Sequence, residues 1–401
     1  MQETVVPKPY QFVPPHQGTF WPWLLFQYLP YHTRRVWGIE QTEFHGLEHL
    51  QASLQAGHGI LLASNHCRPS DPFVLGLLGK QLGLPMYAMA SWHLFAYSRV
   101  QRWLLRRAGV FSILREGMDR EALKCATQIL VEAKRPLVIF PEGVISRGND
   151  RLGPITDGVA FITRTAAKTR AQNNPPGQVV VHPVMLRYTF HGDLAKEVEP
   201  VLEKIEKRLG LFAFPKLKLS ERIRRVGQVL LSIKEVEYFG QAQIGTTGER
   251  VERLLNHVLN KLEERYLAGQ TADAPWNRIR KLRTAILQQW MNGGSDDAKA
   301  LHWHHLVECS FALALNFYPP GYIASDMTAE RLLETVERFE EDLYDNARTH
   351  RPLHCRIDVA EAIPVSTERV RGQTDPLSMQ LEERLKAMLT ATAHLCHPWK
   401  E

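Results

Sequence analysis

Residues 60–75 read ILLASNHCRPSDPFVL, and they predict a strand, a loop and a helix in succession. The apolar run Ile60–Ala63 is typical of a buried strand, and a second apolar run follows Pro72. Asp71 and Pro72 are residue types that begin helices. His66 therefore lies on the loop after a buried strand, which is a common position for functional residues in α/β proteins.

The alternation of strand and helix patterns continues to about residue 190. Apolar residues recur at helical spacings of three and four over residues 119–134. Further strands are predicted at Met86–Ala90, Val110–Leu114, Leu137–Phe140 and Val179–Leu186, and further helices at 95–107 and 158–170. Glycine or proline bounds several of the apolar runs, as is typical of buried parallel strands. The sequence thus predicts an α/β fold with a mixed, largely parallel sheet flanked by helices.

The character of the chain changes after about residue 195. Helical patterns follow at 249–266, 276–291, 298–316 and 328–347, and again from about residue 376. We therefore expect three regions: an aromatic N-terminal segment over 1–39, the strand-and-helix domain over 40–195, and a mainly helical C-terminal region of unknown role over 196–401.

The composition is that of a folded protein, with 401 residues of which 44% are hydrophobic and 23% are charged. The net charge of +6 favours anionic surfaces or substrates, but zinc-finger spacing, RNA-binding motifs and a basic arm are missing, so no nucleic acid is expected. The five cysteines are scattered and form no C-x-x-C pair, which indicates free thiols in a reducing compartment. The polar start of the chain is unlike a signal peptide, and no apolar run is long enough to span a membrane. A cytoplasmic location follows.

Residues 19–31, TFWPWLLFQYLPY, are rich in aromatic side chains and precede Arg34 and Arg35. Aromatic residues beside cations favour the headgroup zone of a bilayer, where such a segment can lie without spanning it. The alternative is a short hydrophobic helix packed on the core. The first interpretation predicts a peripheral protein at the inner face of a membrane.

His66 and Asp71 are five positions apart, which places them far apart around a single helix. They can meet only if the histidine lies on a loop that folds back toward the start of the helix. Asp71 as the helix cap would stay ionised and accept a proton from one ring nitrogen of His66, leaving the other nitrogen basic. The alternative is an ordinary helix cap beside a structural histidine.

Two further stretches end predicted strands with charged residues. VIFPEGVISRGND (138–150) carries Glu142, Gly143 and Arg147, and its glycine permits a tight turn or a close approach of a ligand. GVFSILRE (109–116) presents Arg115, a residue suited to bidentate recognition of phosphate. Each stretch alone also fits a solvated turn.

Together, these stretches closely resemble the glycerolipid acyltransferase family over about residues 40–195. The first motif, N-H-x-x-x-x-D, is matched by Asn65, His66 and Asp71, and the second, G-x-x-F-x-x-R, by Gly109 and Arg115. The third, F-P-E-G-T-R-S, is matched by Phe140, Pro141, Glu142, Gly143 and Ser146. The fourth, a V-P-V-like strand motif, is matched by Pro183 and Val184, so all four occur in order. Ser112 stands at the phenylalanine position of the second motif, with Phe111 beside it, while Val144 and Ile145 replace the threonine and arginine of the third. We expect Arg147 to compensate for the missing cation.

The resemblance implies an O-acyltransferase in phospholipid biosynthesis. His66, oriented by Asp71, would take the proton of an acceptor hydroxyl that attacks an acyl thioester. The acceptor would be a glycerol phosphate such as 1-acylglycerol-3-phosphate, and the donor acyl-CoA or an acyl carrier protein, with no cofactor and no metal. Substrate binding would fall to Asn65, Gly109, Arg115, Pro141, Glu142, Gly143 and Arg147.

Three alternatives stay open at this point. The acceptor can be another lipid, such as a lysophospholipid or an amino-acid lipid, because the third motif is altered. His66 can instead activate water in a hydrolase. The chain can also be a catalytically silent membrane-binding scaffold. The histidines of HWHH (302–305) lack a carboxylate or cysteine to complete a metal site, so we expect none there.

Overall fold

The computed structural model describes residues 10–115, 117, 119–173, 175–212, 217–269, 274–318, 321–322, 327–368 and 375–400. These form two compact units. The first, here called the sheet unit, comprises Tyr10–Gly192 and Thr349–His397, and the second, the helical unit, comprises Asp193–Arg348 with the last residues from Pro398. Residues 1–9 of the expected N-terminal segment lie outside the described part of the chain.

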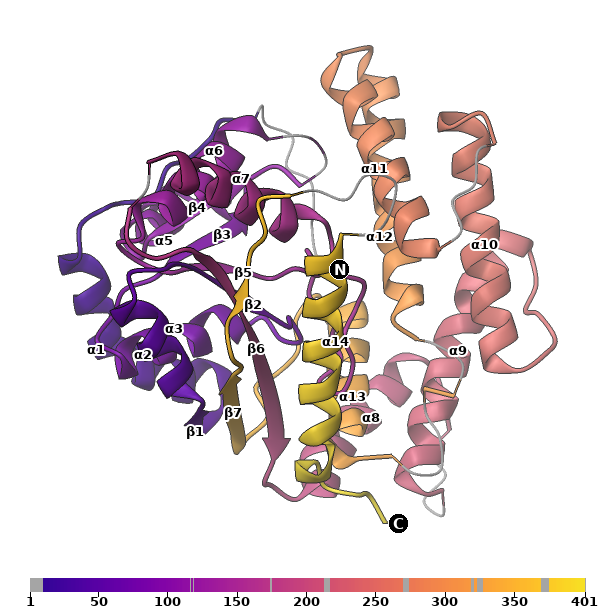
Figure 1. Cartoon of the computed structure of the whole chain (residues 1–401). Helices are drawn as coiled ribbons and strands as arrows, with labels where there is room; N and C mark the ends of the chain where they lie inside the picture. Colours follow the sequence, from indigo (N-terminus) through magenta and orange to yellow (C-terminus); the bar gives the residue numbers. More distant parts are fainter. Residues whose placement is uncertain are drawn as a thin grey trace. The chain divides into compact units, whose positions relative to one another are not determined.

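The sheet unit contains a mixed, largely parallel sheet, so the predicted fold class is confirmed (Figure 1). Within the described residues its order is β1 (Ile39–His45), β7 (Leu353–Val359), β6 (Val179–Phe190), β2 (Gly59–Ser64), β5 (Leu137–Ile139), β3 (Tyr87–Ser91) and β4 (Val110–Ile113), and the short β8 (Ile363–Pro364) pairs with β6. Only the pairings of β6 with β7 and with β8 are antiparallel among those described.

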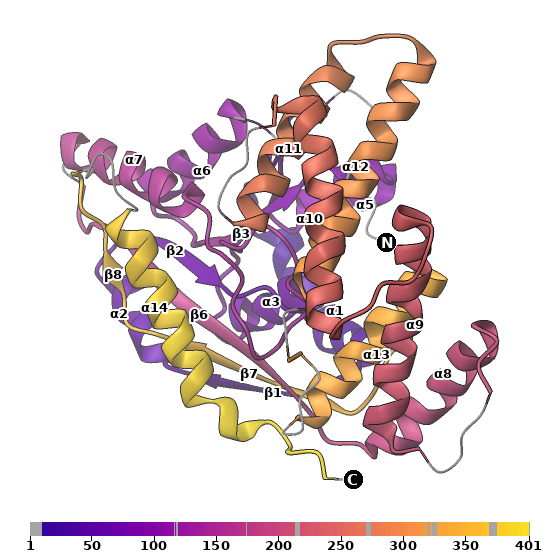
Figure 2. The same ribbon diagram turned by 90° about the vertical axis from the view of Figure 1, so that its right-hand side faces the viewer.

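Helices cover both faces of this sheet (Figures 1 and 2). One face carries α6 (Arg120–Glu132), α7 (Gly158–Asn173) and α14 (Pro376–Ala391), and the other carries α1 (Phe20–Trp37), α2 (Leu47–Gln55) and α3 (Asp71–Gln81). Leu61 and Ala63 of β2 belong to the core that α6 and α7 close. Because both faces of β2 are covered, every residue of this strand is buried, which explains its unbroken apolar sequence.

The sheet contains three strands that the sequence analysis did not predict, namely β1, β7 and β8. Two of them lie within residues 349–397, which we had placed in a mainly helical region over 196–401. The physical reason is the length of β6. This strand runs beyond the end of β2, and β7 pairs with it antiparallel from Val184 to Phe190, so the chain returns to the sheet unit after residue 348.

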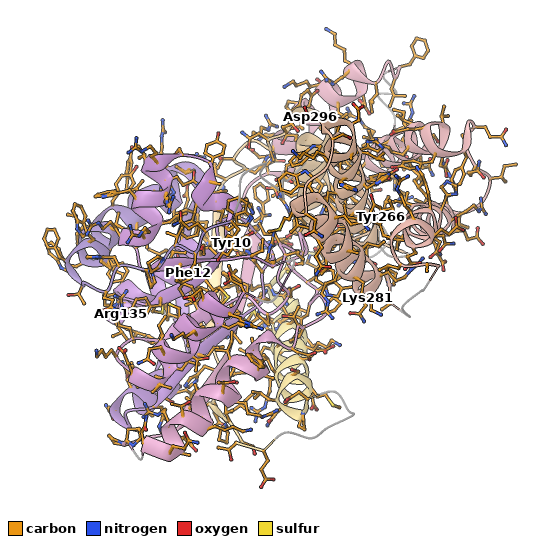
Figure 3. The ribbon with its side chains drawn as sticks, turned by 90° about the horizontal axis from the view of Figure 1, so that it is seen from above. Tyr10, Phe12, Arg135, Tyr266, Lys281 and Asp296 are labelled. Atoms are coloured by element: carbon orange, nitrogen blue, oxygen red, sulfur yellow. The ribbon has the colours of Figure 1, made fainter. Side chains whose placement is uncertain are left out.

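The N-terminal segment 10–13 runs beside β4, the edge strand. The backbone N–H of Ser112 donates to the Val13 carbonyl at 3.1 Å, and the Val13 N–H donates to the Ser112 hydroxyl at 2.8 Å. Phe12 packs against Phe111 with ring centroids 6.4 Å apart. Figure 3 shows Tyr10 and Phe12 on the sheet unit. The segment thereby covers an edge that would otherwise expose unpaired backbone groups.

The helical unit consists of α8 (Leu194–Arg208), α9 (Leu219–Phe239), α10 (Thr247–Tyr266), α11 (Pro275–Met291), α12 (Asp296–Asn316) and α13 (Ala329–Tyr344). Helices α10, α11 and α12 contact one another, as do α8, α9 and α13. Buried ion pairs join neighbouring helices, with Arg278 Nη2 2.9 Å from Glu263 Oε2 and Arg250 Nη2 2.7 Å from Glu235 Oε2. Among the described residues, no helix combines the length and the apolar character that crossing a bilayer requires.

Candidate active site

The candidate site lies at the carboxyl edge of the parallel strands. His66 follows β2, Glu142 follows β5, and Arg115 follows β4. Since these strands are parallel members of one sheet, their carboxyl ends meet at the same edge. The topology therefore explains how residues from three separate motifs reach one place.

His66 and Asp71 form the pair that the sequence predicts. His66 Nδ1 lies 2.8 Å from Asp71 Oδ2; the Asp71 side chain is fully buried, and that of His66 is 14% exposed. The imidazole also stacks on the Phe140 ring, with centroids 3.9 Å apart. Because the ionised Asp71 accepts the proton of Nδ1, the other ring nitrogen, Nε2, is left as the basic atom. The arrangement can therefore act as an oriented general base.

Asp71 is held by the start of α3 and by two further donors. The N-cap of this helix is Ser70, so Asp71 is the first helical residue and not the cap we predicted; its position in the first turn still favours the ionised form. The Arg68 N–H donates to Oδ2 at 2.9 Å, and the Tyr188 hydroxyl donates to Oδ1 at 2.6 Å. Hydrogen bonds to both oxygens stabilise the buried carboxylate.

Glu142 holds the backbone of His66. Its Oε1 accepts the His66 N–H at 2.8 Å, its Oε2 accepts the Gly153 N–H at 2.6 Å, and its side chain is buried. Burial raises the pKa of Glu142 to about 7, although both hydrogen bonds act to lower the pKa. Ser146 completes the arrangement, since its N–H and hydroxyl donate to the His66 carbonyl at 2.7 and 3.0 Å. The structure thus gives Glu142 a positioning role, whereas the resemblance implied contact with the acceptor.

Arg115 contacts the loop that carries the other predicted residues of the stretch 138–150. Arg115 Nη1 donates to the Gly143 carbonyl at 2.6 Å, and Gly143 takes a left-handed φ of 71° that makes the turn possible. Pro141 is buried, and its carbonyl accepts both the N–H and the hydroxyl of Thr156 at 2.9 Å. Arg147 lies half-buried in the same loop, with a φ of 57°. Two cations are thereby carried on loops at the carboxyl edge.

Two predicted substrate-binding residues have structural positions instead. Gly109 precedes β4, so it lies at the opposite end of that strand from Arg115, and its φ of 93° suits a turn. A Cβ added at this position would lie 2.7 Å from Arg135 Nη2 and 2.8 Å from the Met86 carbonyl oxygen, so a side chain would clash there. Asn65 is fully buried, and both polar atoms of its amide are bonded to the backbone of Leu186. Both residues thus make structural contacts, and their role in substrate binding stays a prediction.

Asn65 and Asn149 continue the sheet where β2 stops. The last residue of β2, Ser64, pairs with Val184, and among the described strands none pairs with β6 beyond this point on that side. The Asn65 amide donates to the Leu186 carbonyl at 3.0 Å and accepts the Leu186 N–H at 2.7 Å. Asn149 does the same for Tyr188, at 2.6 and 2.7 Å. Two side-chain amides therefore replace the missing peptide groups of the ladder.

Sequence reasoning missed Asn149 and Tyr188 as parts of the site. Asn149 falls within the quoted stretch 138–150, but an asparagine in a loop has many roles, and Tyr188 lies 117 positions from Asp71. The only available signal was that both residues lie within or just after a matched motif. The hydrogen bonds between Asn149 and Tyr188 form only because β6 extends past the end of β2.

Comparison with known proteins gives a family match over the residues that form this site. Residues 41–187 match the family model described as Acyltransferase, and this range contains β2 to β5 and most of β1 and β6. Among curated proteins, no match to the chain is found. The match agrees with the resemblance drawn from the motifs, and it covers the part of the chain that carries them.

Proposed function

We propose that the protein transfers a fatty acyl group from an acyl thioester to the free hydroxyl of a glycerol-phosphate lipid, with 1-acylglycerol-3-phosphate as the first candidate acceptor. The observation that carries this proposal is the His66–Asp71 pair, in which a fully buried carboxylate orients a partly exposed imidazole. The acyl donor would be acyl-CoA or an acyl carrier protein, and no further cofactor takes part.

The pair supplies the proton transfers that this reaction needs. Nε2 of His66 takes the hydroxyl proton while the acceptor oxygen attacks the thioester carbonyl carbon. The tetrahedral adduct then expels the thiolate, and the imidazolium returns its proton to the sulfur. Asp71 stabilises the imidazolium through Nδ1. A thioester is reactive enough that no nucleophile from the enzyme is required.

The two cations at the same edge support an anionic acceptor. Arg115 and Arg147 are carried on the loops that follow β4 and β5. A guanidinium binds phosphate oxygens through parallel hydrogen bonds, which fits the phosphate of a lysophosphatidic acid. Because Val144 and Ile145 replace polar and cationic residues of the family motif, other acceptors belong in the same assay.

A surface of the sheet unit fits the inner face of an anionic membrane. It is formed by α1 with α4 (His93–Ala96) and α5 (Arg99–Arg107), and we call it the aromatic surface. The Trp21 and Trp103 rings meet at 4.9 Å and join α1 to α5, with Arg107 5.4 Å from the Trp21 ring. Its exposed apolar side chains are Phe20, Trp23, Leu24, Tyr28, Tyr31, Val36, Leu94, Tyr97, Val100, Trp103 and Leu104.

Charge supports the same partner for the aromatic surface. The segments 19–37 and 92–108 contain six arginines and neither aspartate nor glutamate: Arg34, Arg35, Arg99, Arg102, Arg106 and Arg107. Exposed tryptophan and tyrosine between cations are typical of the interface of an anionic bilayer. Such docking would place the enzyme where its lipid acceptor resides.

The decisive experiment compares the wild type with His66→Ala. Each protein receives a labelled acyl-CoA together with 1-acylglycerol-3-phosphate, glycerol 3-phosphate, a lysophospholipid or an amino-acid lipid. We expect label in phosphatidic acid with the wild type, and a loss of about 10²–10⁴-fold in kcat with the variant. His45→Ala, which removes an exposed histidine of β1, is the matched control and should retain full activity.

Each other outcome of this assay has a definite meaning. Equal transfer by the wild type and His66→Ala would overturn the assignment of the base. Label transferred only to another acceptor would correct the substrate class. Free fatty acid released without any acceptor would show a hydrolase, and binding to vesicles without turnover of any substrate would show a scaffold.

A further inference from the structure

The oxygen of Asp71 that does not face His66 is also occupied. The Tyr188 hydroxyl donates to Oδ1 at 2.6 Å, while Oδ2 accepts the proton of His66 Nδ1. Ser70 Oγ lies 3.1 Å from the Tyr188 hydroxyl, and the Tyr188 side chain is fully buried. Burial, and then the nearby charge of Asp71, raise the pKa of Tyr188, so the phenol keeps its proton and is the donor.

We propose that Tyr188 is a positioning residue for the reaction, one that acts on His66 through Asp71. A carboxylate turns about a broad torsion, and donors on both oxygens restrict that rotation. The phenol also withdraws charge from the carboxylate, which limits how strongly Asp71 stabilises the imidazolium form of His66. Tyr188 thus sets both the orientation and the basicity of the general base. The kinetic part of this inference rests on the function proposed above.

Tyr188 is fixed by hydrogen bonds to its backbone and by a cation close to its ring. Asn149 bonds to both the N–H and the carbonyl of Tyr188, at 2.7 and 2.6 Å. The Arg68 guanidinium lies 5.4 Å from the centre of the Tyr188 ring. Asn149 lies in the loop between β5 and α7 that also carries Glu142. One loop therefore holds the backbone of His66 through Glu142 and the backbone of Tyr188 through Asn149.

Replacing the tyrosine by phenylalanine isolates the role of the hydroxyl. The ring of Tyr188→Phe would fill the same buried space, but Oδ1 of Asp71 would lose its 2.6 Å donor. The negative charge on Asp71 would then be less spread, which favours the protonated form of His66 and raises its pKa. The looser carboxylate would also hold Nδ1 less well. We therefore expect a lower kcat and a neutral imidazole only at higher pH.

The test measures two quantities in Tyr188→Phe and in the wild type: the pH profile of kcat with acyl-CoA and 1-acylglycerol-3-phosphate, and the NMR titration of the His66 ring without substrate. We expect kcat to fall about tenfold with KM unchanged, because one hydrogen bond to a charged group is lost. The acidic limb of the profile and the His66 titration should both move to higher pH. Tyr87→Phe, on β3 beside Arg135, is the matched control and should leave both unchanged.

A second variant protects the test against misfolding of Tyr188→Phe. Ser70→Ala removes a partner of the phenol but leaves the ring and β6 in place, and Ser70 makes no side-chain cap of α3. It should shift the His66 titration in the same direction by a smaller amount. An unchanged His66 titration in both variants would overturn the proposal, even if Tyr188→Phe were less stable. A wild type without transferase activity, in which these titration shifts still appear, would refute only the proposed reaction.

Discussion

At the scale of single residues, the site uses a buried acid to hold a peptide group. Glu142 has both oxygens bonded to backbone N–H groups, and burial raises its pKa from 4.5 to about 7. Between these two values the folded protein keeps a proton that the unfolded chain has already released. The contribution of Glu142 to stability is therefore greatest below pH 4.5 and falls as the pH rises toward 7.

Glu142→Gln should remove this part of the pH dependence. From pH 5 to pH 8 the wild type should lose up to about 3 kcal/mol of unfolding free energy more than the variant, since one pKa unit corresponds to about 1.4 kcal/mol. Urea denaturation of both proteins at the two pH values measures the difference. Glu43→Gln, an exposed change on β1, should behave as the wild type. Parallel pH dependences in the wild type and Glu142→Gln would contradict the assignment.

The residue scale also shows which part of the site is readable from the sequence. The His66–Asp71 contact was predictable because a strand, a proline and a helix start lie within ten residues. Glu142 contacts His66 from 76 positions away, and Tyr188 contacts Asp71 from 117 positions away. A local sequence pattern does not predict contacts between residues so far apart in the chain. Gly109 lies at the other end of β4 from Arg115. A motif gives the order of residues but not the end of the strand at which each one lies.

At the scale of elements, the strands differ in how clearly their sequence reports them. The five predicted strands carry continuous apolar runs, and each forms within four residues of its predicted ends. β7 carries a strict alternation, with Leu353, Cys355, Ile357 and Val359 buried, but it follows a long helical stretch and was overlooked. β1 is an edge strand whose second and third residues are both exposed, so its alternation is weak.

The aromatic surface of α1, α4 and α5 gives a prediction about lipid binding. Trp23→Glu should weaken sedimentation with vesicles of phosphatidylglycerol and phosphatidylcholine about tenfold, because it replaces an interfacial aromatic by a charge that anionic lipid repels. Phe161→Glu is the matched control, since Phe161 of α7 is 52% exposed and Trp23 is 56% exposed, yet α7 covers the other face of the sheet. Equal loss in both variants, or none in either, would refute docking by the aromatic surface.

At the scale of the whole molecule, the helical unit is an insertion between two paired strands. β6 ends at Phe190, which pairs with Leu353 of β7, and the His191 N–H donates to the Pro352 carbonyl at 3.0 Å. Residues 193–348 thus leave and rejoin the sheet unit at neighbouring positions. Without them, β6 and β7 would form an ordinary antiparallel hairpin with a short loop.

Removal of residues 193–348, with Gly192 joined to Thr349 and the chain ended at His397, should leave a folded sheet unit. We expect cooperative thermal unfolding by circular dichroism and an unchanged NMR titration of His66, because the described core cluster around Leu61 and Ala63 draws all its residues from the sheet unit. The contrasting deletion removes Thr349–His397. It should abolish folding, since β1 pairs only with β7 among the described strands. A sheet unit that fails to fold without the insertion would contradict this division.

The place of the insertion also bears on how force would travel through the molecule. β6 is tied at Tyr188 to the carboxylate of the base, and the helical unit begins five residues later, at Asp193. Backbone hydrogen bonds between β6 and β7 connect the two attachment points of that unit. A pull at Gly192 and Thr349 would break these hydrogen bonds one pair at a time, starting at the ends of the strands. Tension that opened only the first pairs, at Phe190 and Thr189, would reach Tyr188 next. A mechanical load on the insertion would therefore act on the proton-transfer machinery before it disturbed the centre of the sheet.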